Sequence, residues 1–151
     1  MPPRKNKQLW EIVQERRKVG RPVKFETPEQ MAEAAAAYFK WVQDNPLKEA
    51  KLSQGRVHSL NKMQAMTLGG MCLHMGITFQ TYKNYQANER FFDVCAEIEE
   101  VIKHQKYVGA AAGLLNPAII ARDLGLVDKT ENTQKHEINV IEKFEGDNDE
   151  Q

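Results

Sequence analysis

The stretch from Ala65 to Asn88 constrains the fold most, because it encodes two short helices with a tight turn between them. Thr67 can cap the first helix, since its hydroxyl can accept from the free backbone N–H groups of the first turn. Gly76 tolerates the left-handed conformation that often ends a helix, and Thr78 can cap a second helix. Apolar residues recur at helical spacing in the first helix, namely Leu68, Met71, Cys72 and Met75. The pattern therefore predicts a helix-turn-helix.

Two interpretations of this motif remain open. The motif is either a helical corner packed into a small core or a DNA-binding unit. In a DNA-binding unit the second helix sends polar side chains from its N-terminal half into the major groove. Gly69 and Gly70 cost the first helix roughly 1 kcal/mol each relative to alanine, so they either weaken it or mark a close neighbour. The candidate DNA-reading residues are Gln80, Thr81, Lys83 and Asn84.

The length of 151 residues predicts one compact domain with tails. No apolar run approaches the roughly 20 residues that span a bilayer, and the first residues lack the apolar core of a signal peptide. The chain is therefore expected in the cytoplasm, without a membrane segment. Cys72 and Cys95 both occupy apolar helix positions, which predicts buried, reduced thiols.

The net charge of zero conceals a gradient along the chain. Residues 1–25 hold eight Lys/Arg and two Glu, a net charge of +6. Residues 26–127 hold ten basic and eleven acidic residues, and residues 128–151 hold three and eight, which gives −1 and −5. The sequence therefore divides into a basic N-terminal arm (1–25), a helical core (26–127) and an acidic tail (128–151).

The basic arm is a candidate DNA-binding segment. Apolar residues interrupt it, so residues 8–18 are predicted to form a short amphipathic helix. Gly20-Arg21-Pro22 matches a minor-groove hook, in which proline keeps the chain extended and arginine lies in the narrow groove. A solubilising arm without fixed structure is the alternative. The cations of the arm are Arg4, Lys5, Lys7, Arg16, Arg17, Lys18, Arg21 and Lys24.

Cap signals outline the other helices. Thr27 and Pro28 begin one helix with a capping box closed by Gln30, and it ends at 44–46. Residues 47–62 have little periodicity and predict a loop or a short hairpin. Asn88 begins a long helix that reaches about residue 115.

A second helix returns along the long one. Asn116-Pro117 begins it and Gly125 stops it, which gives a helical hairpin. Small residues at the end of the long helix allow very close packing, within the subunit or between subunits. The candidate oligomerisation residues there are Gly109, Ala112 and Gly113.

Residues 136–144 read as one strand, because Ile138, Val140 and Phe144 alternate with polar residues. A single strand is not stable alone. It needs the same strand from other subunits or the sheet edge of a partner.

No residue pattern of an enzyme is recognisable. The chain has no Gly-rich phosphate loop followed by Lys-Ser/Thr, and nothing resembles a nucleophile elbow. Its four histidines do not pair with either cysteine at zinc spacing. Asp93, Glu97 and Glu100 fall on one helix side and are interpreted as a solvated acidic face. We therefore expect no catalysis, no cofactor and no metal.

Short motifs between Phe25 and Leu126 occur in the order found in one family. They are Lys24-Phe25-Glu26, Tyr38-Phe39-x-Trp41-Val42, Asn45-Pro46-Leu47, Lys62-Met63-x-Ala65-Met66-Thr67, Thr81-Tyr82-x-x-Tyr85-x-Ala87-Asn88-Glu89, Glu99-Glu100-Val101-Ile102, Gln105-Lys106, Gly109-Ala110-Ala111 and Asn116-x-x-Ile119-Ile120-Ala121-Arg122-Asp123-Leu124-Gly125-Leu126. On these motifs the chain resembles the small terminase subunits of headful-packaging tailed double-stranded DNA phages, which are DNA-packaging recognition proteins.

The resemblance implies a mainly α subunit that forms a homo-oligomeric ring of about eight to ten copies. The strand at 136–144 would pair with its copies in that ring. The implied partners are double-stranded phage DNA carrying the packaging site and the large terminase subunit, whose ATPase and nuclease the ring modulates in the host cytoplasm. Relatives carry a basic C-terminal extension, whereas this tail is −5. We therefore expect the tail to serve protein partners.

Two other functions are compatible with the sequence. A dimeric helix-turn-helix transcriptional regulator would bind an operator through the same motif, and its two-fold oligomeric state would separate it from a ring. A purely structural ring would show no salt-dependent affinity for DNA.

Overall fold

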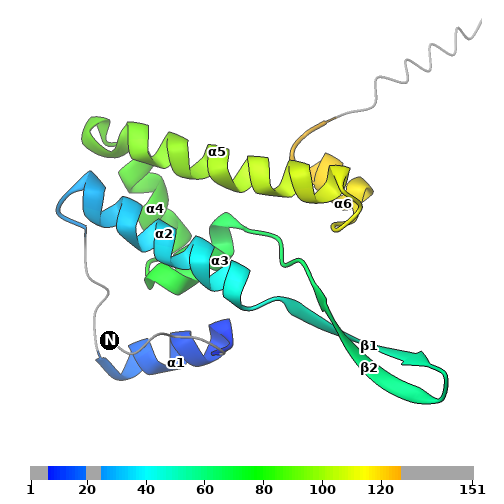
Figure 1. The fold of residues 1–151 in the computed structure, drawn as a ribbon. Helices are drawn as coiled ribbons and strands as arrows, with labels where there is room; N and C mark the ends of the chain where they lie inside the picture. The colour runs from blue at the N-terminus through cyan, green and yellow to red at the C-terminus, as the bar shows by residue number, and fades with distance from the viewer. Residues whose placement is uncertain (1–6, 20–24, 127–151) are drawn as a thin grey trace, which may run out of the picture.

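The computed structural model describes residues 7–19 and 25–126, and it confirms the mainly α fold (Figure 1). The described part forms six helices and one antiparallel pair of strands. In chain order these are α1 (Leu9–Val19), α2 (Pro28–Asp44), β1 (Leu47–Ser53), β2 (Arg56–Lys62), α3 (Leu68–Met75), α4 (Phe79–Gln86), α5 (Glu89–Ala111) and α6 (Pro117–Asp123). The strand predicted at 136–144, with Ile138, Val140 and Phe144, lies outside the described residues.

The predicted helix starts are confirmed. The Thr27 hydroxyl accepts from the Gln30 backbone N–H at 3.3 Å. The Gln30 side chain accepts in return from the Glu26 backbone N–H at 2.9 Å, one residue earlier than a standard capping box. Asn88 and Asn116 cap α5 and α6 in the same manner. Local side-chain chemistry therefore sets where these helices begin.

The long helix ends at Ala111, four residues earlier than expected. The chain turns at Gly113, which has a φ of 73°, and the Gly109 carbonyl accepts from the N–H groups of residues 114 and 115. A Cβ on Gly109 would lie 2.7 Å from Leu115 Cδ1 and 2.8 Å from Met63 Sδ. The small size of Gly109 therefore serves a close approach within the subunit. The assignment of Gly109, Ala112 and Gly113 to a subunit interface stays a prediction.

The helices enclose one apolar core. In Figure 1, α5 runs along α2, α3 and α4 lie beside them, and α1 covers the other side of α3. Ile12 of α1 is 1% exposed, so part of the basic arm belongs to this core. The predicted short helix at 8–18 is thereby confirmed as α1. The fully buried large side chains are Tyr38, Tyr82, Ile12, Met31, Met71 and Cys95.

Both cysteines are free thiols buried in the core, as predicted. Burial raises the pKa of Cys72 to about 11. Burial also raises the pKa of Cys95. Because the thiolate is the reactive form, both residues act at neutral pH as small apolar core residues.

Residues 47–62 form a hairpin, which decides between the two predicted alternatives. Leu47 pairs with Lys62 at the base and Ser53 pairs with Arg56 at the tip. Gln54 and Gly55, between the strands, both have positive φ values, of 52° and 73°. Positive φ at both turn positions matches the right-handed twist of the flanking strands. The hairpin projects away from the helices (Figure 1).

Candidate nucleic-acid interface

The two short helices predicted at the centre of the chain are present as α3 and α4. The Thr67 hydroxyl accepts from the Gly70 N–H at 2.9 Å, and the Thr78 hydroxyl accepts from the Thr81 N–H at 3.1 Å. Gly76 ends α3 with a φ of 79°. Two residues, Ile77 and Thr78, then separate Gly76 from α4, and Ile77 is buried. A helix, a short turn at Gly76 and a second helix thus follow one another in the predicted order.

A tyrosine from α2 fixes the start of α3. The Tyr38 hydroxyl accepts from the Thr67 N–H at 3.0 Å. A Cβ on Gly70 would lie 2.7 Å from the same hydroxyl oxygen, whereas Gly69 faces open space. Of the two glycines, Gly70 therefore has the close neighbour that the sequence suggested.

A second tyrosine fixes α4 on α5. The Tyr82 side chain is fully buried, and its hydroxyl lies 3.3 Å from both the Cys95 carbonyl oxygen and Glu99 Oε1. Gln86 Nε2 donates to the same Glu99 oxygen at 2.7 Å. Burial, with the nearby Cys95 and Glu99, raises the pKa of Tyr82, so the hydroxyl keeps its proton. These contacts determine which side of α4 faces solvent.

The solvent side of α4 carries Gln80, Lys83 and Asn84. Gln80 Nε2 donates to Asn84 Oδ1 at 3.2 Å, one helical turn away. Thr81 is half-buried, and its hydroxyl lies 2.8 Å from that of Thr78. Three of the four predicted DNA-reading side chains therefore lie together on the surface, while Thr81 supports the cap. Sequence reasoning missed Phe79, which is half-exposed with Lys83 Nζ 5.4 Å from its ring centre.

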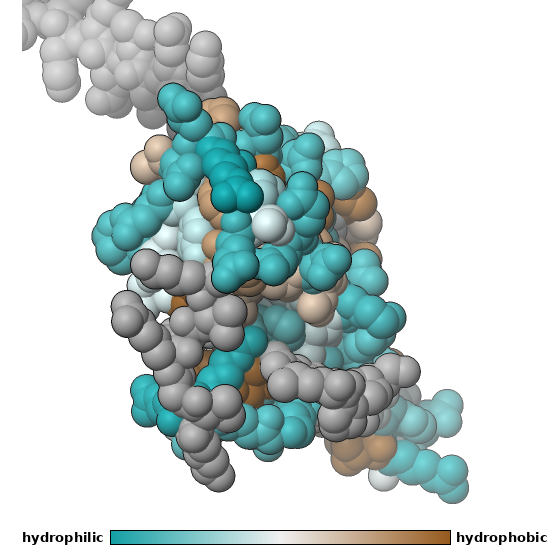
Figure 2. All heavy atoms as spheres, turned by 90° about the vertical axis from the view of Figure 1, so that its left-hand side faces the viewer, coloured by the Kyte–Doolittle hydropathy of each residue, from teal (hydrophilic) through white to brown (hydrophobic). Residues whose placement is uncertain are grey.

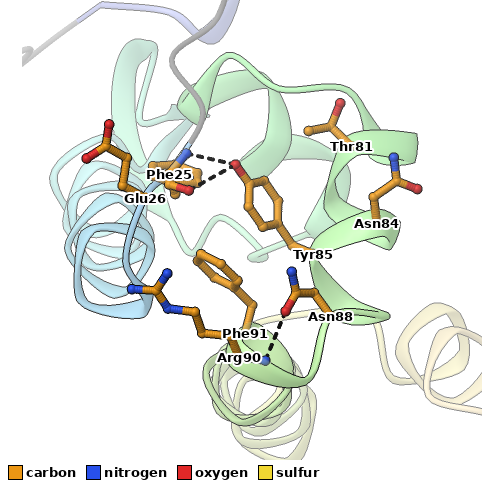
Figure 3. A pocket seen from close by; sticks show the side chains of 8 residues that line it. All are labelled: Phe25, Glu26, Thr81, Asn84, Tyr85, Asn88, Arg90 and Phe91. Atoms are coloured by element: carbon orange, nitrogen blue, oxygen red, sulfur yellow. Dashed lines mark hydrogen bonds between the residues drawn. The ribbon is translucent and has the colours of Figure 1, made fainter.

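An open pocket of about 340 Å³ lies where the basic arm joins the core (Figure 3). The Tyr85 hydroxyl accepts from the Phe25 N–H at 2.7 Å and lies 3.4 Å from the Phe25 carbonyl oxygen. Figure 3 shows Tyr85 between Phe25 on one side and Asn84 on the other. The lining residues are Phe25, Glu26, Thr81, Asn84, Tyr85, Asn88, Arg90 and Phe91. The end of the arm is thus held beside the exposed side of α4.

Helix α1 holds another part of the arm against the same motif. Trp41 Nε1 donates to the Lys7 carbonyl oxygen at 3.0 Å. The Arg16 guanidinium lies so close to Gly76 that any side chain there would displace it. Arg16 is therefore packed against the turn between α3 and α4. No sequence signal pointed to this contact, because its partners are 60 residues apart.

Besides Arg16, the structure describes the side chains of two arm cations, Lys7 and Arg17. Lys7 forms an ion pair with Glu15, and the Arg17 guanidinium lies 6.0 Å from the Trp10 ring centre. Lys18 lies on α1, but its side chain is outside the described structure. Arg4, Lys5, Arg21 and Lys24 also lie outside the described residues.

Figure 2 looks at the end of the molecule where α2 and α5 begin, and shows a mostly hydrophilic surface there.

Within residues 7–19 and 25–126, no three metal-ligating side chains lie close enough to share an ion. None of the helices in the same ranges combines the length and apolarity that crossing a bilayer requires.

Comparison with known proteins defines first a class and then a close relative. A family model described as "DNA-packaging protein gp3" matches residues 20–132, so the chain belongs to this family of DNA-packaging proteins. The chain is also 43% identical over 131 residues to the small terminase subunit of Salmonella phage P22, covering 84% of this chain and 79% of that protein. The resemblance to small terminase subunits is thereby confirmed, and it supports a role in DNA packaging.

Proposed function

We propose that this chain is a viral DNA-packaging adaptor that recognises the packaging site on double-stranded phage DNA. It assembles into a ring, recruits the large terminase subunit and modulates the ATPase and nuclease of that subunit in the host cytoplasm. One observation carries DNA recognition: Gln80, Lys83 and Asn84 lie together on α4, beside the point where the basic arm joins the core. Membership in a DNA-packaging family supports this function over a dimeric transcriptional regulator.

In this proposal the basic arm supplies affinity for DNA and α4 supplies selectivity for the packaging site. Lys83 is the only Lys or Arg between Ala65 and Asn88, so the helix pair alone supplies little attraction for phosphates. The arm, with eight cations, supplies the salt-dependent affinity. The amides of Gln80 and Asn84 match the donor and acceptor pattern of base edges. Phosphate contacts then position the subunit, and base contacts from α4 select the site.

No residue of the adaptor takes a catalytic role in this proposal. The two thiols are buried, and the pKa of Cys72 is about 11. Tyr38 and Tyr82 are likewise buried, with hydroxyls engaged in hydrogen bonds. The chemistry of packaging then belongs to the large terminase subunit. The described side chains support positioning and recognition.

Changing Lys83→Ala together with Asn84→Ala tests the reading helix. We expect the preference for packaging-site DNA over random DNA to fall roughly ten-fold, because a good base contact contributes about 1–3 kcal/mol of discrimination. Competition binding with labelled packaging-site DNA measures this ratio. The matched control is Glu33→Ala with Lys40→Ala, an exposed pair on α2. A double variant with the parent's preference would show that α3 and α4 form only a structural corner.

Truncation after Val127 tests the assignment of the acidic tail to protein partners. The net charge of −5 repels phosphates, and at physiological salt charges interact over roughly 8 Å. We expect DNA binding to persist while stimulation of the large subunit's ATPase weakens several-fold. A shorter truncation after Phe144 separates the predicted strand from the charged end. Lost DNA binding with normal capture of the large subunit would contradict the assignment.

A further inference from the structure

The β1–β2 hairpin exposes four large apolar side chains, Leu47, Leu52, Val57 and Leu60. Every residue of both strands is exposed, and within the described residues each strand packs extensively only on the other. A two-stranded hairpin is at best marginally stable alone in water. Two strands of seven residues extend about 20 Å at roughly 3.3 Å per residue, so the tip lies far from its own core. The described part of the chain therefore supplies no packing partner for either face of the hairpin.

The strand register divides the hairpin into two different faces. Leu52 lies opposite Val57, and directly opposed side chains share one face of an antiparallel pair. These two side chains are 71% and 72% exposed. The other face carries Lys51 opposite His58. Residues 47–62 hold four Lys/Arg and one Glu, so the hairpin carries +3.

An apolar groove of about 580 Å³ lies between the C-terminal end of α2 and the middle of α5. Its apolar lining includes Met63, Met66, Val101 and Val108, and Glu100 borders it. Val101 and Val108 are nearly half-exposed. Farther along α5 the exposed residues include Asp93 and Glu97. Because Glu100 forms an ion pair with Lys103 at 3.3 Å, the groove has an apolar floor, and the acidic side chains Asp93 and Glu97 lie outside it on α5.

We infer that the Leu52–Val57 face of one copy's hairpin docks in this groove of the next copy. The apolar pair matches the floor of the groove, and the +3 hairpin is complementary in charge to Asp93 and Glu97 farther along α5. Met63 of the groove directly follows Lys62 at the base of the hairpin, whereas Leu52 and Val57 lie next to the turn, so the two surfaces of one copy are separated by the length of the hairpin. Such a head-to-tail contact repeats from copy to copy and closes a ring if the rotation permits. The inference rests on the ring of the proposed function.

The hairpin's charge also suits contact with DNA. An apolar pair next to the tip of the hairpin favours a protein partner, since a hairpin that contacts only phosphates needs cations there. The experiments below separate the two partners.

Leu52→Ser with Val57→Ser removes the proposed contact without touching the core. We expect the mass measured by native mass spectrometry to shift from the oligomer to single subunits of 17.3 kDa at micromolar concentration. The matched control is Lys51→Ser with His58→Ser, the opposed pair on the other face, which should keep the oligomer. An unchanged oligomer in the Leu52/Val57 variant overturns the inference. If the Leu52/Val57 variant keeps the oligomer but binds DNA more weakly, the hairpin is a DNA-binding element instead.

A cross-link identifies the two surfaces directly. Leu52→Cys protein mixed with Val101→Cys protein is expected to give disulfide-linked pairs of copies under mild oxidation, and neither alone should do so. The native thiols are buried and do not compete. Linking by Leu52→Cys alone would mean that hairpins meet hairpins, and would overturn the inference. If no cross-link forms but the protein still prefers packaging-site DNA, the contact is refuted and the proposed function stands. If the cross-link forms but that preference is absent, the contact stands and the proposed function is refuted.

Discussion

Replacing Lys5, Arg17 and Lys24 by glutamine is expected to weaken binding to double-stranded DNA about a hundred-fold at physiological salt. In the proposed function each lost cation removes one phosphate contact, and each contact contributes about 0.9 to the slope of log affinity against log salt. In a ring the loss repeats in every copy. Fluorescence anisotropy titrations at several salt concentrations measure both the affinity and the slope.

Substitution is preferable to deletion of the arm, because α1 belongs to the core. Removing residues 1–24 would also remove buried Ile12 and the Lys7 carbonyl that accepts from Trp41. The matched control neutralises three exposed cations elsewhere, namely Lys40, Lys103 and Arg122. An arm variant with the parent's affinity and slope would place DNA binding outside the arm. Equal losses in arm and control variants would indicate a general charge effect.

Helix boundaries were predictable because they depend on side chains a few residues away. Thr27, Thr67 and Asn116 each accept from a backbone N–H within three residues. The hairpin at 47–62 was harder, since it has no buried face to impose alternation on the sequence. The C-terminal end of α5 was misplaced because the chain reverses where Leu115 packs on Gly109. That contact reflects tertiary packing, which helix periodicity does not contain.

The candidate interface was predictable in its composition and much less in its arrangement. Gln80, Lys83 and Asn84 follow from helical spacing after the Thr78 cap. By contrast, the Tyr85–Phe25 hydrogen bonds join residues 60 positions apart. The packing of Arg16 against Gly76 is also long-range. Sequence periodicity therefore identified the surface of α4, while the attachment of the arm beside it required the folded chain.

Tyr82→Ala is expected to lower the free energy of unfolding by about 4 kcal/mol, in the range of other buried aromatic truncations. The Tyr82 side chain is fully buried, so its removal leaves a cavity between α4 and α5. Tyr82→Phe keeps the ring and loses only the hydrogen bonds near Cys95 and Glu99. Its expected cost is about 1 kcal/mol. Urea unfolding followed by circular dichroism measures both values.

The difference between these two variants links the stability of α4 to its proposed role. Tyr107→Ala, at a site 57% exposed on α5, is the control and should change stability by less than about 0.5 kcal/mol. If Tyr82→Ala cost no more than this control, Tyr82 would not anchor α4. Tyr82→Phe stays folded, so its preference for packaging-site DNA can be measured. A preserved preference would show that packing of the Tyr82 aromatic side chain is enough to orient Gln80 and Asn84. A reduced preference would assign part of that orientation to the Tyr82 hydroxyl.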